Sequence, residues 1–450
     1  MTQSIAERLA AFLAGLDQIP TPCIATAYHL LLDVAGLCVA ARNDDYIQAT
    51  LATAEPGGSC TAFGHARALG SYDAALVNGT AAHGEDFDDT FEGGPVHSGA
   101  VIVPALLALG ERERLSGADL LRGLVAGSEI MCRSSLVAPK AIHKAGFHPT
   151  AVLGALAASA ACATALRLPE AQIVSALGIA GSMASGIIEY LAEGTWTKRM
   201  HAGWAAQSGI RAALMARGGF LGPRTVFEGA HGFFHAFAPS RTPDFAPLLD
   251  HLGERWLMPS IAFKPYACGT MTQPYIDCAI ALSGLNPADI AEITCEVGEG
   301  TVHRLWEPLS VKHAPPTHYA AKFSTPYCIA VGLLDRRAGF QQFTEARIHD
   351  PALLALTRKI RYEIDPDNPY PAQFTGHLRA TMTDGSVQEV RQAYMRGGAQ
   401  APLSEAELET KFADNCRYGG WTDSQADRLR VTLAALFTQP DLAALSEFRA

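Results

Sequence analysis

The sequence predicts a mainly α-helical protein, in which a large all-helical domain built from both chain ends carries a smaller inserted α+β lid domain. Helical patterns rich in alanine and glycine fill about the first 240 residues and return near residue 401. Between them, apolar and polar residues alternate as they do in half-buried strands. Because 450 residues exceed one ordinary core, we expect a helical domain of residues 1–258 plus 401–450 and a lid of residues 259–400.

The predicted helices of the large domain are mostly apolar. Residues 20–41 open with prolines, which suit a first helical turn, and continue as an apolar segment. Residues 98–113 are apolar on most faces, and residues 148–168 are nearly all apolar and rich in alanine. Because a helix without a polar face must be covered on all sides, we expect residues 148–168 to lie buried among other helices.

The predicted lid domain shows clear strand patterns. Residues 288–300 alternate between apolar and polar side chains. Residues 377–394 contain Asp384 and Gly385 between two alternating segments, a pair typical of a tight β-hairpin turn. Lys322, one of the charged residues of this region, is expected on a solvated face.

Composition and charge exclude several classes of protein. The net charge of −10 argues against a nucleic-acid partner, which needs a basic face. The ten cysteines form no C-x-x-C pair, which argues against a zinc ribbon or a thioredoxin-like site and fits a reducing cytoplasm. The N-terminal segment MTQSIAERLAAFLAGL predicts an amphipathic helix rather than a signal peptide, and residues 101–110 are too short to span a bilayer. We therefore expect a cytoplasmic protein without a membrane segment.

An acidic run, HGEDFDDTFEGGPVH at residues 83–97, raises the question of a metal site. Asp88, Asp89 and Glu92 form D-D-x-x-E, which resembles the magnesium-binding motif of all-helical terpene synthases. Those enzymes need a second acidic motif on a facing helix, and this sequence contains none. H-E-x-x-H is absent as well. The sequence therefore predicts no metal, and these three acidic residues are expected to matter least for the chemistry.

Motifs for common organic cofactors and nucleophiles are also missing. The glycine-rich residues 178–186 lack the G-x-G-x-x-G spacing and a preceding strand, so we expect close helix packing there instead of a dinucleotide. GTWTK at residues 194–198 is not a Walker A loop, and no G-x-S-x-G sequence supports a serine hydrolase. No organic cofactor is predicted.

Polar residues gather where predicted apolar helices begin. His97 precedes the helix at residue 98, His148 opens the buried helix, and Lys198, Arg199 and His201 precede or open the next one. A helix N-terminus carries free N–H groups and partial positive charge, which favour a carboxylate. If these helix starts converge, they would bind an anionic substrate.

Six stretches, taken together with their order and spacing, carry a resemblance to a known family. They are HGEDFDDT followed by HSGAVIVPALLALGE, then GFHPTAVLGA, TWTKRMHAGWAAQSG, FKPYACG and KFSTPY. Through them the chain resembles the MmgE/PrpD family over nearly its whole length. That family includes 2-methylcitrate dehydratase, cis-aconitate decarboxylase and iminodisuccinate epimerase. The resemblance implies an all-helical domain with an α+β lid, a homodimer, and no metal or organic cofactor.

The resemblance also implies which residues form the active site. The residues expected to carry the chemistry are Asp86, His97, His148, Lys198 and Tyr327. Those expected to bind substrate are Thr90, Lys264, Arg199 and His201; of these, Arg199 and His201 come from the helix-start argument. Some members place a histidine where this chain has Cys268, which leaves the substrate open.

The predicted reaction is proton abstraction next to a carboxylate of a small di- or tricarboxylic acid, without a cofactor. His97 and His148 would serve as base and acid in an order left open, Asp86 would orient His97, and Lys198 would stabilise the developing charge. Because dehydration is the outcome most common in the family, a 2-methylcitrate dehydratase-like lyase is expected. HSGA after His97 differs from the longer H-P-S-D-N-L-G of 2-methylcitrate dehydratases. An iminodisuccinate-like epimerase and a cis-aconitate-type decarboxylase therefore stay open. A non-catalytic binding protein with the same fold is a further alternative, which the presence of the matched polar residues except at Cys268 disfavours.

Overall fold

The computed structural model describes residues 3–449, which separate into two compact units. The first, which we call the helical unit, runs to Gly84, resumes over Asp88–Ile261 and returns from Leu408 onward. The second, the mixed unit, comprises Ala262–Glu407 together with the three residues Glu85–Phe87. The chain therefore leaves the helical unit for three residues in the middle of the acidic run and then re-enters it.

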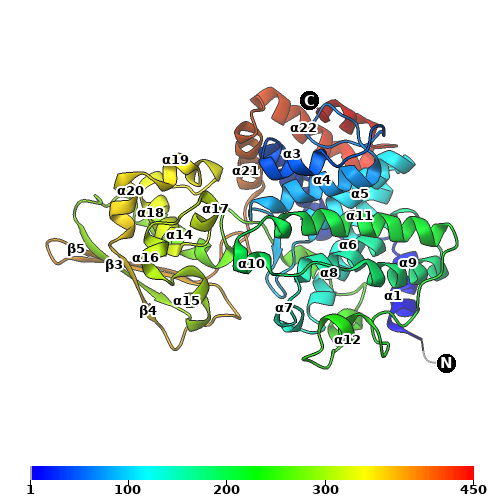
Figure 1. Cartoon of the computed structure of the whole chain (residues 1–450), viewed down its shortest axis with the longest axis horizontal. Helices are drawn as coiled ribbons and strands as arrows, with labels where there is room; N and C mark the ends of the chain where they lie inside the picture. The colour runs from blue at the N-terminus through cyan, green and yellow to red at the C-terminus, as the bar shows by residue number, and fades with distance from the viewer. Residues whose placement is uncertain (1–2, 450) are drawn as a thin grey trace. The chain divides into compact units, whose positions relative to one another are not determined.

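The helical unit is built from helices of very different length (Figure 1). Its first part contains α1 (Ile5–Ala14), α2 (Thr21–Ala41), α3 (Asp45–Leu51), α4 (Ser71–Gly84), α5 (Ser98–Glu113), α6 (Gly117–Ser135), α7 (Ala141–Lys144), α8 (Pro149–Ala165) and α9 (Glu170–Met183). Its second part contains α10 (Tyr190–Glu193), α11 (Thr197–Arg217), α12 (Phe233–Phe237), α13 (Ala246–Leu249), α21 (Glu405–Tyr418) from Leu408 onward, α22 (Asp423–Ala435) and the 3-10 helices η1 (Met258–Ser260), η4 (Leu436–Thr438) and η5 (Ala443–Arg449).

Helix α8 forms the centre of this unit, as its all-apolar sequence predicts. It packs against α5, α6, α9 and α11. Small residues allow the close approach: a Cβ atom on Gly127 of α6 would lie 2.6 Å from the Cβ of Ala161, and one on Gly209 of α11 would lie 2.3 Å from the Cβ of Ala158. Because such distances are far below van der Waals contact, larger side chains would push these helices apart.

Among the described residues, one helix, α2, is long and apolar enough to cross a membrane by length and composition. In the structure 78% of its apolar window is buried, and it packs against α4, α5 and α6. This is the environment of a core helix.

The prediction of an all-helical large domain is wrong. The strand β1 (Thr90–Phe91) lies in the helical unit and pairs with β2 (Ile261–Ala262), which begins at the last residue of that unit. The backbone N–H of Phe91 also donates to the carbonyl of Val96, which closes a tight loop. A strand of two residues is too short to produce an alternating pattern, so the sequence could not reveal it.

The mixed unit combines short helices with a four-stranded sheet. Its elements are η2 (Thr270–Thr272), α14 (Gln273–Ala281), β3 (Ile290–Val297), α15 (Glu299–Leu305), α16 (Leu309–His313), α17 (His318–Ala321), α18 (Thr325–Asp335), η3 (Phe340–Gln342), α19 (Glu345–Ile348), α20 (Pro351–Thr357), β4 (Ile360–Ile364), β5 (Gly376–Met382) and β6 (Val387–Gln392).

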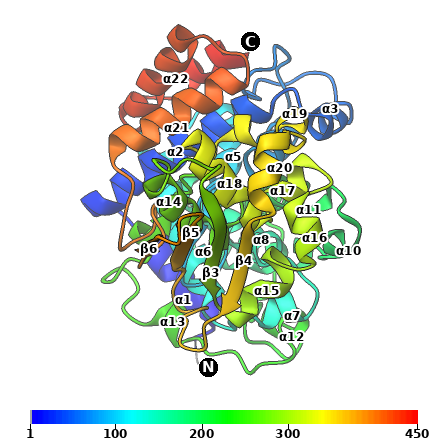
Figure 2. The same ribbon diagram turned by 90° about the vertical axis from the view of Figure 1, so that its left-hand side faces the viewer.

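The sheet has the strand order β4-β3-β5-β6, and Figure 2 shows β4, β3 and β5 side by side. Strand β3 runs parallel to β4, with Ile293 opposite Ile360, and antiparallel to β5, with Ile293 opposite Ala380. Strands β5 and β6 form the predicted hairpin, in which Gly385 adopts a φ of +84° that suits glycine. Helix α14 packs on β5 and β6 and against α18.

Candidate active site

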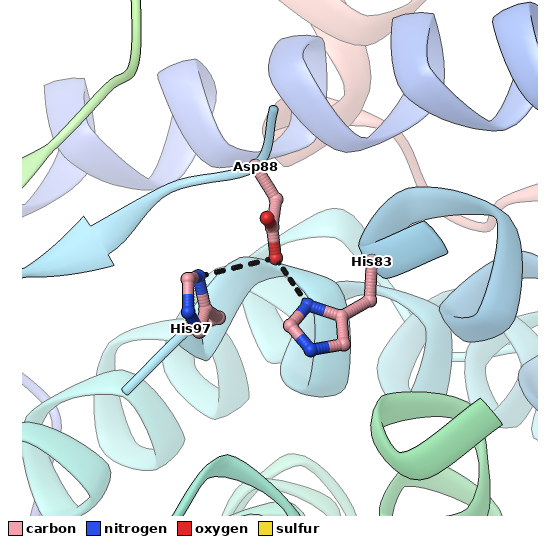
Figure 3. A group of neighbouring side chains, drawn as sticks. All are labelled: His83, Asp88 and His97. Carbon is pink, nitrogen blue, oxygen red and sulfur yellow. Dashed lines mark hydrogen bonds and ion pairs between the residues drawn. The ribbon is translucent and has the colours of Figure 1, made fainter. Parts of the chain in front are cut away.

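Two histidines that flank the acidic run share one carboxylate oxygen in the helical unit (Figure 3). His83 lies in the last turn of α4, and His97 is the residue immediately before α5. The Oδ2 atom of Asp88 is 2.7 Å from Nδ1 of His83 and 3.3 Å from Nδ1 of His97. His83 and Asp88 are fully buried, while the side chain of His97 keeps 12% of its surface exposed.

A second contact fixes the proton position on His97. Its Nδ1 atom is 2.6 Å from the backbone carbonyl oxygen of Asp89. Because a carbonyl oxygen can only accept a hydrogen bond, Nδ1 of His97 must carry the hydrogen. Nε2 is therefore the ring nitrogen of His97 that remains available for proton exchange.

Two further histidines extend the cluster. His148 precedes α8, and its backbone N–H donates to the carbonyl of Gly186. Its Nδ1 atom lies 3.2 Å from Nδ1 of His201 in α11, so one of these two nitrogens donates to the other. The His83 ring stacks on His148 at 5.4 Å between centroids and lies 4.9 Å from the His97 ring. We call these four residues the histidine cluster.

The protein environment disfavours positive charge on three members of the cluster. Burial lowers the pKa of His83 to about 4, against the opposing effect of the Asp88 carboxylate. Burial likewise lowers the pKa of His201 to about 4 and that of His148 well below its ordinary value. The charge of Lys198, in the first turn of α11, and the neighbouring imidazoles act in the same direction. These three imidazoles are therefore neutral at pH 7 until an anion adds negative charge.

Asp89 serves the backbone of α5. Its carboxylate accepts the N–H of Gly99 at 2.9 Å and the hydroxyl of Ser98 at 3.3 Å, which caps the start of the helix. Burial and the charge of Asp88 raise the pKa of this carboxyl to about 7. Asp89 therefore has a structural role at the start of α5, whereas Asp88, also expected to matter little for the chemistry, lies against two histidines of the cluster.

Asp86, predicted to orient His97, makes two contacts within the mixed unit. Its Oδ2 accepts the hydroxyl of Tyr319 at 2.5 Å, and its backbone carbonyl accepts Nζ of Lys264 at 3.1 Å. Within the helical unit, the carboxylate beside His97 is that of Asp88. Asp86 adopts a left-handed φ of +57°, so the chain turns sharply between the two aspartates and their side chains do not follow a regular helix or strand period.

The remaining predicted residues lie as follows. The hydroxyl of Tyr327, on α18, donates to the carbonyl of Gln342 at 2.6 Å in the core of the mixed unit. Thr90 is buried in β1, and the guanidinium of Arg199 lies 4.3 Å from the ring centre of Tyr46 in the helical unit.

Within the helical unit the structure brings together His97, His148 and His201, and the charge of Lys198 acts on His148 and His201. Within the mixed unit it brings together Asp86 and Lys264. Sequence reasoning missed His83, Asp88 and Tyr319. The spacing of His83 and Asp88 around the end of a helix was the available signal for the first two. Tyr319 lies just before the KFSTPY motif, and that motif predicted a catalytic role for Tyr327 instead.

His83, Asp88 and His97 are a group, among the described residues, that could hold a metal ion, since their ligand atoms lie within 4.8 Å of one another. Ligand atoms at about 2.0–2.2 Å from a tetrahedral ion are separated by roughly 3.3 Å. The 2.7 Å between His83 Nδ1 and Asp88 Oδ2 is instead the distance of a charge-assisted hydrogen bond. The geometry therefore fits a shared proton better than a shared cation.

Comparison with known proteins identifies the class of enzyme that this fold and histidine cluster represent. The family model of the MmgE/PrpD N-terminal domain matches residues 7–246, and that of the MmgE/PrpD C-terminal domain matches residues 266–436. The chain therefore belongs to the MmgE/PrpD family, which confirms the resemblance seen in the sequence motifs, and it is a lyase.

Particular relatives make the comparison more specific. Over 362 residues, 76% of this chain and 71% of the relative, the chain is 33% identical to the cis-aconitate decarboxylase of Mus musculus. It is 30% identical to the cis-aconitate decarboxylase of Aspergillus terreus over 404 residues, and this match covers 82% of this chain and 80% of that protein. It is 32% identical to the cis-aconitate decarboxylase of Homo sapiens over 351 residues, and this match covers 76% of this chain and 72% of that protein.

Proposed function

We propose that the chain is a decarboxylase of a small unsaturated tricarboxylate of the cis-aconitate class. The observation that carries this proposal is the histidine cluster, in which neutral, mostly buried imidazoles lie under the influence of Lys198. Such a site gains proton affinity and hydrogen bonds when a polyanion enters it. The relatives named above favour decarboxylation over the dehydration expected from the sequence and over the alternative of epimerisation.

The chemistry requires one proton and no redox step. In cis-aconitate, a saturated carbon links one carboxylate to the alkene. When the bond from that carbon to its carboxylate breaks, CO2 leaves and the bonding electrons form a new double bond. The electrons of the old double bond then move to its far carbon, which lies next to another carboxylate and takes up a proton. One tricarboxylate and one proton thus give one dicarboxylate and one CO2.

His97 is the proton donor that the geometry supports best. It keeps part of its side chain exposed, whereas His83 is fully buried and His148 and His201 are nearly so. Its Nδ1–H is held by the Asp89 carbonyl, so proton transfer uses Nε2. In this proposal Lys198 and the remaining imidazoles bind the carboxylates and stabilise the negative charge that spreads over the allylic system in the transition state.

Proton NMR of the purified protein with cis-aconitate in heavy water tests the proposal. We expect a dicarboxylate with one deuterium on its new saturated carbon, together with release of CO2. A panel containing 2-methylcitrate and iminodisuccinate separates the other outcomes, because dehydration yields an alkene and epimerisation yields only solvent exchange. Absence of turnover on cis-aconitate, with turnover of another acid in the panel, would replace this proposal.

We further propose that the reaction needs no metal or organic cofactor, since every step described above uses side chains of this chain. Turnover should be unchanged after dialysis against EDTA. Loss of activity in EDTA that returns on addition of a divalent cation would contradict this proposal.

A homodimer is also proposed. Large apolar side chains are exposed on the segment of the helical unit that runs from just before α10 into the first half of α11, where a second copy would cover them. They are Ile187, Leu191, Trp196, Met200 and Trp204. Light scattering should give twice the mass of 47.7 kDa, and Trp204→Lys should lower it toward that value. A monomeric wild-type protein would contradict this.

A further inference from the structure

We propose that Asp88 is a positioning residue for His97, and that His83 holds Asp88 in place. The structural basis is one buried carboxylate oxygen, Oδ2 of Asp88, that lies between the Nδ1 atoms of both imidazoles (Figure 3). This inference rests on the proposed function, because it assigns His97 the proton transfer.

The first step concerns how a charged group is kept at this place. Asp88 is fully buried, and a buried carboxylate is costly unless hydrogen bonds replace its water. The short 2.7 Å contact with His83 provides such a bond if Nδ1 of His83 carries the hydrogen. His83 itself is fixed by the last turn of α4 and by stacking on His148.

The second step concerns the other side of the His83 ring. Among the described residues, Nε2 of His83 is buried without a hydrogen-bond partner. It is inaccessible to solvent and therefore unsuited to exchange protons with a substrate. The burial that lowers the pKa of His83 to about 4 keeps the ring neutral, so it donates one hydrogen bond to Asp88 without cancelling the carboxylate charge.

The third step concerns what that charge does at His97. The Asp89 carbonyl already fixes the hydrogen on Nδ1 of His97, so Asp88 is not needed to choose the tautomer. Instead, its negative oxygen at 3.3 Å stabilises the imidazolium that forms when His97 is reloaded with a proton. The other charged and titratable groups that the described contacts place around His97 include Asp89, His83 and His148, and the charge of Lys198 acts on the same cluster.

Three variants separate positioning from catalysis. Asp88→Asn should lower kcat roughly 10- to 100-fold with a smaller change in KM, and should move the pH profile of kcat/KM to lower pH, since the imidazolium loses its counter-charge. His83→Leu should also lower kcat. His83→Asn should restore most of the activity, because its side-chain NH2 group replaces the Nδ1 donor.

His83→Asn is therefore the informative control. If it is as impaired as His83→Leu, the imidazole has a role beyond donation to Asp88 and the proposal is wrong. An unchanged pH profile in Asp88→Asn would also overturn it. Circular dichroism and thermal unfolding of each variant show whether a loss of activity reflects misfolding, in which case the following measurement decides.

Nitrogen-15 NMR of the histidine-labelled wild-type protein tests the arrangement without turnover. We expect the Nδ1–H tautomer for both His83 and His97, and a changed His83 signal in Asp88→Asn. The Nε2–H tautomer on His83 would overturn the proposal. If the tautomers are as expected but cis-aconitate is not decarboxylated, the positioning geometry stands and only the proposed function fails.

Discussion

The Nζ atom of Lys322 lies 2.5 Å from the Oε2 atom of Glu85 and also donates to the backbone carbonyl of Glu85 at 2.8 Å. Lys322 is 1% exposed, so both bonds are sheltered from water. Lys264 holds the following carbonyl, that of Asp86, at 3.1 Å. Two buried lysines of the mixed unit therefore fix the segment that joins His83 to Asp88 along the chain.

Replacing Lys322 with Met should lower the free energy of unfolding by about 3–5 kcal/mol, because the Glu85 carboxylate would stay buried without its cation. The double variant Glu85→Met with Lys322→Met should recover much of that loss, since no buried charge remains unpaired. Urea unfolding of the single and double variants measures both effects. Additive losses in the double variant would show that the pair is not coupled.

The sequence predicts much of this fold because the helices and the hairpin produce patterns that extend over many residues. The buried helix α8 and the hairpin at Gly385 follow from apolar content and turn chemistry. Features that depend on a single side-chain contact could not be predicted from the sequence. Lysine is usually solvated, so nothing in the sequence distinguishes Lys322, expected on a solvated face, from an exposed lysine.

The candidate site was predictable in part for the same reason. Histidines at helix starts indicated an anion site, and the structure groups His97, His148 and His201. The contact between Asp88 and His97 follows a left-handed turn at Asp86, and a single aspartate in that conformation leaves no sequence pattern.

Binding of a tricarboxylate should be accompanied by proton uptake. The pKa of His83 and of His201 is about 4 and that of His148 is well below 6.5, so all three are neutral near pH 7. A bound anion raises these pKa values, so the complex holds more protons than the free protein and affinity rises as pH falls from 8 to 6. Calorimetry in buffers of different ionisation enthalpy measures the uptake, with acetate as the control ligand. A binding enthalpy that does not depend on the buffer would contradict this.

The two lid-region tyrosines should respond differently to loss of the hydroxyl. Tyr327→Phe leaves the carbonyl of Gln342 unpaired in the core, which should cost about 1–3 kcal/mol of stability and leave kcat of the folded enzyme near wild type. Tyr319→Phe removes the hydroxyl that donates to Asp86 and should lower turnover more than it lowers stability. Thermal unfolding and initial rates of both variants distinguish them. The reverse order of kinetic effects would return Tyr327 to the catalytic role that its motif suggested.

A buried ion pair on α6 should be costly to break by removal of one partner. Arg133 contacts Glu129 at 2.5 Å, and both side chains are fully buried. Arg133 also donates to the backbone carbonyls of Pro247 and Asp250 at 3.0 Å, while Glu129 accepts the N–H of Leu257 at 2.8 Å. The pair therefore ties the segment that follows α12 to α6 through backbone groups that would otherwise lack partners.

Arg133→Met should lower the free energy of unfolding by about 3–5 kcal/mol. The substitution leaves the Glu129 carboxylate buried without its cation and removes the donor to the carbonyls of Pro247 and Asp250. Arg217→Met is the matched control: its pair with Glu113 is partly exposed at 2.8 Å and should contribute at most about 1 kcal/mol. Urea unfolding compares the two variants directly. Equal losses would mean that the exposed pair is as important as the buried one, contrary to the difference in their surroundings.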